Sequence, residues 1–323
     1  MINESPIFIS LLYRSGSTLL SLILDQSKEI NSTSDTIHFM RHSINHYQPI
    51  EKNYKNLIED TCSRIKEKWD FNLSSESVLN RLHNHTAISQ STIYDSLVRT
   101  FLNLNDEETW CDRTAVAWEQ IPSFLKLFPK GKAIHIYRDP RAVLLSFKKY
   151  TFLKGNAYLD SIFASSAMLN FLNQPEITDD HRILLIKYED LVSNPESEIK
   201  NICSFLEIDF ETTMLDVGSF KDKFGHKFDG NSSHFKPRKS IDSKSVNLWE
   251  DGLSKEEIYF SEKILSKELM AYGYSLKNVK LKESEFLNFK EICSDSYIKK
   301  RIDYWEQNNT GLQTYPDTLK AYE

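Results

Sequence analysis

Residues 7–20 read IFISLLYRSGSTLL, in which a largely apolar run is followed by a short polar turn and then by leucines. This order predicts a strand, a tight turn and a helix. Such a turn directs several backbone N–H groups and the positive end of the helix dipole at one point, which favours an anion there. Gly16 leaves room for a ligand to approach the backbone. The stretch therefore predicts a phosphate-binding loop; the alternative is an ordinary strand-to-helix turn without a ligand.

The fixed cation of this loop is Arg14, which precedes Gly16. Loops that bind nucleoside triphosphates follow the pattern G-x-x-x-x-G-K-[ST]. Residues 13–18 have neither the first glycine of that pattern nor the lysine after the second. The loop therefore differs from the triphosphate pattern in that its positive charge comes before the glycine and not after it.

A second strand and helix are predicted at residues 133–146, where AIHIY precedes RDPR and then AVLLS. Asp139 provides the acceptor oxygen expected at a helix N-cap, and Pro140 suits the first helical turn, where its missing N–H costs nothing. Arg138 then lies at the carboxyl end of the strand, and Ser146 lies two turns into the helix. We expect this guanidinium and this hydroxyl to converge on a second phosphate. The alternative is a surface arginine and an ordinary helix serine.

The two elements, in this order along the chain, resemble the sulfotransferase family that uses 3'-phosphoadenosine-5'-phosphosulfate (PAPS) as its donor. By this resemblance the first loop holds the 5'-phosphosulfate, and the residues that do so are Arg14, Ser15, Gly16, Ser17 and Thr18. The second element, through Arg138 and Ser146, holds the 3'-phosphate. The resemblance extends over residues 7–274.

Two further stretches carry the same resemblance. Residues 184–196, LLIKYEDLVSNPE, look like the family's strand, Y-E-D-L turn and following helix, and place Tyr188 near the adenine. Residues 243–249, SKSVNLW, are a looser match to a polar loop that closes over the nucleotide. The basic run at 236–239 contributes Lys239 as a candidate for the 3'-phosphate or an anionic acceptor; the alternative is a solvated loop.

Sulfuryl transfer between two oxygens proceeds through a loose, in-line transition state, so its catalysis consists mostly of positioning and charge stabilisation. Arg14 is the first candidate for the charge that meets the leaving phosphate. The second is Arg113, at a place where related sulfotransferases commonly have a lysine. An arginine supplies charge and two parallel donors but is a poor proton donor. The alternative for Arg113 is a surface ion pair with Asp112.

The acceptor hydroxyl must lose its proton during attack, so a carboxylate or histidine is expected near the donor sulfur. Asp35 is the predicted general base, because it follows the first helix at the distance where protein-tyrosine and bacterial sulfotransferases have paired acids; Ser34 replaces the first of that pair. His38 is the rival base, and a helix N-cap is the alternative role of Asp35. The spacing of His38, His42 and His46 is compatible with zinc, but we expect no metal because the transfer needs none.

Composition is that of a globular enzyme. The chain has 323 residues, 40% of them hydrophobic, and a formal net charge of -6, which argues against a nucleic-acid partner. No run of eighteen apolar residues and no secretory signal are present, so we expect no membrane span and a cytoplasmic location. Four cysteines, Cys62, Cys111, Cys203 and Cys293, form no C-x-x-C pair and are expected to be reduced thiols.

Alternating strands and helices imply right-handed crossovers and a parallel sheet. We therefore predict an α/β fold, a P-loop-like parallel sheet flanked by helices on both faces, as in the sulfotransferase fold. The sulfotransferase domain is expected at residues 1–275, with a C-terminal helical extension at 276–323. Helices are predicted at 18–27, 51–69, 89–104 and 284–305, and a short strand at 109–112.

The predicted function is transfer of a sulfuryl group from PAPS to a hydroxyl or amine of a small-molecule, glycan or peptide acceptor. Acceptor pockets in this family are built from variable segments, here 37–104 and 150–172. Two other functions stay open: a non-catalytic nucleotide-binding protein on the same fold, and a P-loop nucleotide kinase.

Overall fold

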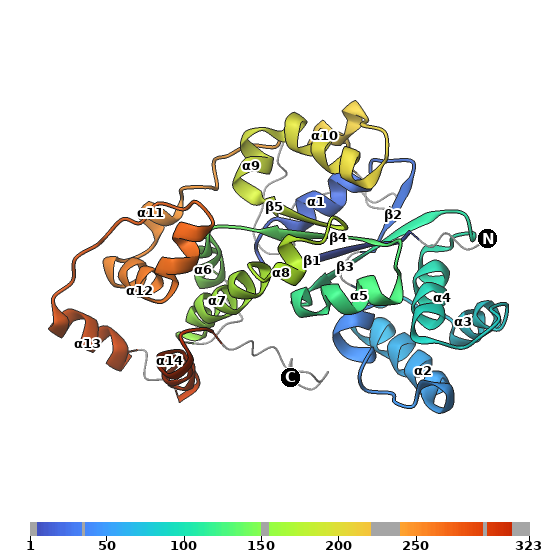
Figure 1. Ribbon diagram of the computed structural model, residues 1–323. Helices are drawn as coiled ribbons and strands as arrows, with labels where there is room; N and C mark the ends of the chain where they lie inside the picture. Colours follow the sequence, from blue (N-terminus) through green and yellow to red (C-terminus); the bar gives the residue numbers. More distant parts are fainter. Residues whose placement is uncertain (1–4, 34–35, 150–154, 221–239, 293–295, 312–323) are drawn as a thin grey trace.

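The computed structural model describes residues 5–33, 36–149, 155–220, 240–292 and 296–311. Among these residues, five parallel strands form one sheet in the order β2-β3-β1-β4-β5 (Figure 1). They are β1 (Ile7–Leu11), β2 (Ile30–Ser32), β3 (Thr109–Ala115), β4 (Lys132–Tyr137) and β5 (Ile183–Lys187). Because the strands are parallel, their carboxyl ends share one edge, where such sheets bind ligands. The predicted α/β fold is confirmed.

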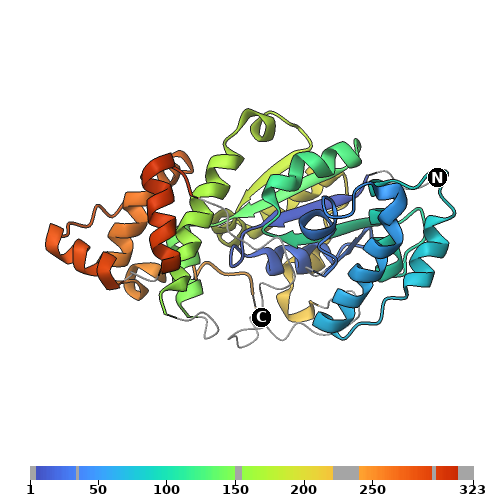
Figure 2. The same cartoon turned by 90° about the horizontal axis from the view of Figure 1, so that it is seen from below.

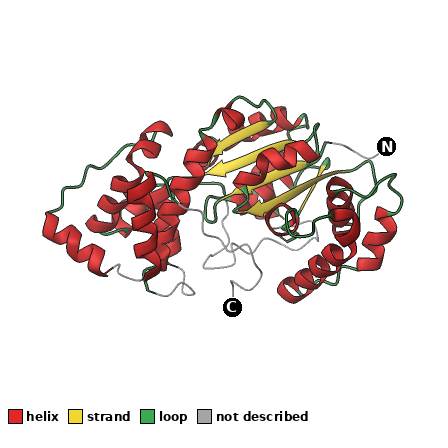
Figure 3. Cartoon of the chain, turned by 60° about the horizontal axis from the view of Figure 1, so that its bottom comes forward, coloured by secondary structure: helices red, strands yellow, loops and turns green. Residues whose placement is uncertain are grey.

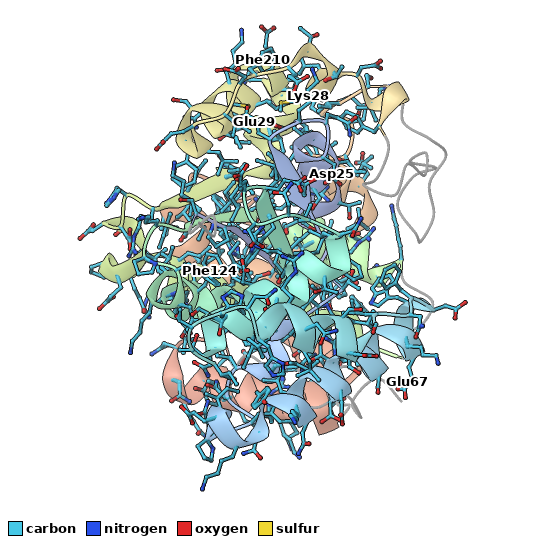
Figure 4. The ribbon with its side chains drawn as sticks, turned by 90° about the vertical axis from the view of Figure 1, so that its right-hand side faces the viewer. Asp25, Lys28, Glu29, Glu67, Phe124 and Phe210 are labelled. Atoms are coloured by element: carbon cyan, nitrogen blue, oxygen red, sulfur yellow. The ribbon has the colours of Figure 1, made fainter. Side chains whose placement is uncertain are left out.

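Helices cover both faces of the sheet (Figure 3). One face carries α1 (Ser17–Leu24), α9 (Tyr188–Ser193) and α10 (Pro195–Leu206); the other carries α4 (Gln90–Leu102), α5 (Ile121–Leu127) and α7 (Asp160–Leu172). The ring of Phe8 in β1 stacks on Phe124 of α5 with centroids 5.0 Å apart. On the opposite face, Lys132 of β4 donates to the carbonyl of Phe205 in α10 at 2.8 Å. Figure 4 labels one residue from each of these sides, Phe124 in α5 and Phe210 just after α10.

Two further groups of helices lie at opposite ends of the sheet (Figure 1, Figure 2). Near β3, α2 (Ile50–Trp69) and α3 (Ser75–Leu82) pack with α4. At the other end, α11 (Trp249–Gly252), α12 (Lys255–Ala271), α13 (Glu283–Ile292) and α14 (Ser296–Asn308) gather around α6 (Pro140–Lys148) and α7. Shorter elements are η1 (Phe39–Ser43), η2 (Trp118–Gln120), η3 (Ala157–Leu159), α8 (Pro175–Thr178), η4 (Thr212–Leu215) and η5 (Val217–Ser219).

The second group of helices has its own hydrophobic core, separate from the core around the sheet. Residues before and after position 275 contribute to it, including Leu144, Phe163, Leu265, Ile298 and Ile302. Polar contacts join the same elements: Arg301 of α14 donates to Asp160 of α7 at 2.9 Å, and Arg141 of α6 donates to Glu262 of α12 at 2.8 Å. The C-terminal helices are thus packed onto α6 and α7.

Most predicted elements are confirmed, with three differences. Helices α2 and α4 and strands β4 and β5 lie where the sequence predicts them, and β3 continues three residues beyond the predicted strand, to Ala115. The single helix predicted at 284–305 is wrong, because α13 and α14 are separate helices. The first helix also ends at Leu24, earlier than predicted.

The centre of the sheet contains buried polar side chains. Ser10 of β1 pairs with Thr114 on one side and His135 on the other, and all three are buried. Nε2 of His135 lies 3.2 Å from the sulfur of Met168 in α7. Burial lowers the pKa of His135 to about 3, so its imidazole is neutral in the folded protein. In the parts of the chain that the structure describes, we found no helix long and apolar enough to cross a bilayer.

Candidate active site

The loop between β1 and α1 has the backbone shape that the sequence predicts for an anion-binding turn. Gly16 is the N-cap of α1 and has a φ of 99°, and Arg14 also has a positive φ of 74°. A Cβ atom at Gly16 would lie 2.2 Å from Cδ2 of Tyr188. Ser15 is buried and its hydroxyl donates to the carbonyl of Leu12 at 2.5 Å. Only glycine therefore satisfies both the conformation and the space at position 16.

The residues predicted for the two ends of the nucleotide lie next to each other. Nε of Arg14 donates to the hydroxyl of Ser146 in α6 at 2.9 Å. Nη1 of Arg138 donates to the carbonyl of Arg14 at 3.2 Å. Arg14, Arg138 and Ser146, which we call the donor cluster, thus come together from two strand ends and a helix.

Tyr188 packs against this cluster and also contacts Gly16 and Ser245. The guanidinium carbon of Arg138 lies 4.5 Å from the centroid of the Tyr188 ring, and Gly16 approaches the same ring. The Tyr188 hydroxyl lies 2.9 Å from Oγ of Ser245, whose carbonyl accepts from Nη2 of Arg138 at 2.7 Å. The loosely matched stretch 243–249 therefore contacts both Arg138 and Tyr188.

Arg113 lies at the start of α1 rather than on the surface beside Asp112. Its Nη1 donates to the hydroxyls of Ser17 at 3.4 Å and Thr18 at 3.3 Å. Successive strand residues point to opposite faces. Asp112 accordingly lies on the other face, fully buried, where it accepts from the hydroxyls of Thr33, Tyr94 and Thr114. The alternative of an Arg113–Asp112 ion pair is wrong.

Of the two predicted general bases, the structure describes His38 but not Asp35. Asp35 lies outside the described residues, as does Lys239. His38 is 1% exposed and has a φ of 54°, and Nη1 of the buried Arg64 lies 3.5 Å from its Nδ1. Arg64 also donates to the carbonyls of Thr36 and Ile37. Arg64 thus holds the backbone of this segment from α2.

The three histidines predicted at helical spacing do not share one regular helical face. His38 precedes the single π-helical turn η1, which contains His42, and His46 follows it. The rings of His38 and His42 lie 5.6 Å apart. Within the described ranges, no three His, Cys, Asp or Glu side chains form a group able to hold a metal ion.

Two buried donors of this site lack hydrogen-bond partners among the described residues: Nε of Arg113 and Nε of Arg138. A buried, unpaired donor on a charged group costs stability unless a ligand engages it. Together with the hydroxyls of Ser17, Thr18 and Ser146, these guanidinium groups form an edge rich in hydrogen-bond donors at the carboxyl ends of β1, β3 and β4.

Some contacts of this edge gave no signal in the sequence. Glu189, directly after Tyr188, accepts from the backbone of Asp139 and from the hydroxyl of Tyr274. Arg41 of η1 donates to the hydroxyl of Tyr13 at 3.1 Å. These pairs join segments that are distant in sequence, and no local pattern identifies such partners.

Known proteins share this fold, and a family model spans the residues of this site. A model of the sulfotransferase family matches residues 6–212, which include the loop at Gly16, Arg113, Arg138 and Tyr188. The sulfotransferase domain of the Synechococcus PCC 7002 olefin synthase is 22% identical with a TM-score of 0.53, over 80% of this chain and 94% of that chain. The sulfotransferase domain of the curacin biosynthetic pathway is 20% identical with a TM-score of 0.51, over 84% and 98%.

Among curated proteins, a Caenorhabditis briggsae protein described as "Putative protein-tyrosine sulfotransferase" is 22% identical over 278 residues, which are 79% of this chain and 84% of the relative. The fold and the site thus define an α/β enzyme that transfers a group from an anionic nucleotide. The chain belongs to the sulfotransferase family. The predicted class of PAPS-dependent sulfotransferases is confirmed, and the kinase and non-catalytic alternatives are set aside.

Proposed function

We propose that the donor cluster and Tyr188 hold one PAPS molecule, and that Arg113 faces its sulfuryl group. The contact of Arg138 with the backbone of Arg14 carries this proposal, because it brings the predicted 5' and 3' sites within reach of one nucleotide. In this arrangement the loop from Ser15 to Thr18 surrounds the 5' end, and Gly16, Ser17 and Thr18 bind it with their backbone N–H groups, whereas the N–H of Ser15 donates to the carbonyl of Leu12. Arg138 and Ser146 bind the 3'-phosphate, with Lys239 as a further candidate.

The adenine is proposed to lie against the Tyr188 and Ser245 side of the site. Arg138 lies over the Tyr188 ring, and a Cβ atom at Gly16 would meet Cδ2 and Cε2 of the same ring. The Tyr188 hydroxyl, which contacts Ser245, is therefore the part proposed to face the adenine. The specificity for a 3'-phosphorylated nucleotide then depends on Arg138, which contacts this ring directly.

The proposed chemistry is electrostatic. During transfer, the bond between sulfur and the bridging oxygen breaks while the acceptor oxygen approaches, and negative charge grows on the leaving phosphate. Arg14 and Arg113 lie on two sides of the α1 N-terminus, whose dipole also favours this charge. Arg113 contributes charge and donors rather than a proton, because its guanidinium stays protonated.

Asp35 is our candidate for the base that removes the acceptor proton, with His38 as the rival. His38 is buried, and Nη1 of Arg64 lies 3.5 Å from its Nδ1, so this nitrogen is not open to an acceptor hydroxyl. We therefore rank Asp35 first. Single-turnover rates of Asp35→Asn and His38→Gln distinguish them: the variant of the true base loses rate while it still binds the nucleotide.

The acceptor is proposed to carry a hydroxyl or an amine, with small molecules, glycans and peptides as the classes to compare. A tyrosine peptide belongs in this comparison because of the description of the nematode relative. Transfer of label from ³⁵S-PAPS to a panel of phenols, sugars, peptides and lipids identifies the class.

Calorimetry with 3'-phosphoadenosine-5'-phosphate (PAP) and with AMP tests the donor site. The proposal requires that PAP binds at least ~30-fold more tightly than AMP, since two charge-assisted contacts serve the 3'-phosphate alone. Equal affinities for the two nucleotides contradict the assignment of Arg138 and Ser146.

A further inference from the structure

Arg138 and Tyr188 are each followed by an acidic residue, Asp139 and Glu189. The β4–β5 ladder ends with the pair Tyr137 and Lys187, so the two donor-site residues occupy the next place beyond it. Here the chains diverge, because α6 begins at position 140 and α9 at 188. Backbone hydrogen bonds between β4 and β5 therefore end just before Arg138 and Tyr188, so another contact must keep these two side chains together.

Glu189 bridges this gap with its side chain. One carboxylate oxygen accepts from the backbone N–H of Asp139 at 3.0 Å, and the other accepts from the hydroxyl of Tyr274 at 3.1 Å. Tyr274 is a buried residue of the segment after α12, and Nζ of Lys187 lies 4.1 Å from its ring centroid. One carboxylate thus joins the end of β4, the end of β5 and the C-terminal helices.

The carboxylate of Glu189 is costly to keep in this place. Burial raises its pKa, which means that its surroundings disfavour the charge. The neighbouring carboxylate of Asp139 is engaged by the guanidinium of Arg141, at 3.0 Å to Nε and 2.8 Å to Nη2. Glu189 accepts from neutral donors, and the nearby charge of Arg138 only partly offsets the cost of its burial. Its pKa stays raised, so stability alone does not account for a carboxylate in this place.

We propose that Glu189 is a positioning residue, which fixes Arg138 over the ring of Tyr188 so that the 3'-phosphate and the adenine are bound together. This inference rests on the proposed donor site. Glu189 holds the residue after Arg138 and directly follows Tyr188, so it sets the spacing between the two without touching the nucleotide. Through Tyr274, the C-terminal helices then support the donor site.

The test is calorimetry with PAP and AMP on Glu189→Ala and Glu189→Gln. We expect Glu189→Ala to bind PAP about tenfold more weakly, as for the loss of a hydrogen bond to a charged group, and AMP within about twofold of the parent protein. Glu189→Gln retains an oxygen for the N–H of Asp139, so it is expected to keep PAP affinity within about threefold. Equal losses for PAP and AMP in Glu189→Ala would show a general structural role and overturn the proposal.

Two further variants separate positioning from stability. Tyr274→Phe removes only the hydroxyl that donates to Glu189, and is expected to weaken PAP binding about threefold. Glu268→Ala is the matched control, because this buried carboxylate also accepts two hydrogen bonds, from Ser166 and Asn170 of α7. It is expected to lower the melting temperature without changing the ratio of PAP to AMP affinity. A changed ratio in Glu268→Ala overturns the assignment to Glu189.

The double variant Arg138→Ala/Glu189→Ala distinguishes this inference from the proposed function. If Glu189 acts through Arg138, the double variant binds PAP as weakly as Arg138→Ala alone. Full additivity of the two losses overturns the inference and leaves the donor site intact. If Arg138→Ala itself binds PAP normally, the proposed donor site is wrong.

Discussion

Arg113 and Arg138 both lie at the carboxyl edge of the sheet, yet they are held in different ways. Arg138 has two backbone carbonyls as partners, at 2.7 and 3.2 Å, and an aromatic ring at 4.5 Å. Among the described residues, the Arg113 guanidinium donates to two hydroxyls, at 3.3 and 3.4 Å, both on the first turn of α1. Carbonyls and a ring fix a guanidinium in place, whereas long bonds to hydroxyls are readily exchanged for an anion. We infer that Arg138 recognises a part of the donor that stays in place, and Arg113 the group that moves.

The largest effect is expected for Arg113→Ala. Loss of one charged donor at the transferred group is expected to lower the single-turnover rate ~10²- to 10³-fold, with PAP affinity changed less than about threefold. Arg113→Lys, which restores the positive charge, is the matched control and should recover most of the rate. If Arg113→Ala lost as much PAP affinity as rate, Arg113 would bind the nucleotide in the same way as Arg138, and the proposed difference between the two arginines would be wrong.

Gly16→Ala is expected to weaken both nucleotides, because the added Cβ meets the Tyr188 ring at 2.2 Å and the φ of 99° strains any other residue. Backbone strain and the displaced ring together are expected to lower affinity about 100-fold for PAP and AMP alike. Gly155→Ala is the control, since Gly155 also has a positive φ, of 57°, but no described atom beyond its chain neighbours lies within 4 Å of an added Cβ. Normal nucleotide binding by Gly16→Ala would contradict the contact between the loop and Tyr188.

Arg138→Ala tests the other half of the comparison, that Arg138 recognises the 3'-phosphate of the bound nucleotide. Its loss is expected to cost about 2 kcal/mol of PAP affinity, roughly 30-fold, and to leave AMP binding unchanged. Arg182→Ala serves as the control, because Arg182 binds Asp180 just before β5, at the opposite edge of the sheet. Calorimetry gives both affinities. Weaker binding of AMP by Arg138→Ala would mean that Arg138 is not specific for the 3'-phosphate.

The smallest effect is expected for the pH dependence of stability, and it comes from His135 in the sheet that carries both arginines. Burial lowers the pKa of His135 from 6.5 to about 3. Between these pH values the unfolded chain binds one more proton at this residue, so its contribution to the free energy of unfolding falls by about 1.4 kcal/mol per pH unit of acidification. Above pH 6.5 this contribution is constant.

Chemical denaturation of the protein and of His135→Phe between pH 7 and 5 measures this term, and the variant is expected to show the weaker pH dependence. The same pH dependence in both proteins would contradict a neutral, buried His135. Nucleotide affinity at pH 7 should be alike in the two proteins, because His135 lies within the sheet and contacts Met168 rather than the donor cluster.

Local patterns predicted a large part of this protein because the relevant physics is local. The strand, turn and helix around Gly16 follow from an apolar run and one residue without a side chain, and Asp139 caps α6 through the N–H of Arg141 as its position before Pro140 indicates. The single helix predicted at 284–305 was wrong, since the structure describes two helices there, α13 and α14. Periodicity alone cannot place such a break.

The partners of the arginines could not be predicted in this way. Asp112 and Arg113 are neighbours in sequence, but the pleat of β3 sends one to the three hydroxyls on the α4 face and the other to the start of α1. Residue order therefore suggested a pair that the strand geometry excludes.

The order of residues along the chain was sufficient for the family, the parallel sheet and the anion-binding loop, because these depend on short-range patterns in the backbone. Folding in three dimensions was needed to bring Ser245 against Tyr188, and Tyr274 against Glu189, since each contact joins segments more than fifty residues apart. Such contacts depend on how strands and helices pack, and packing is a property of the whole chain.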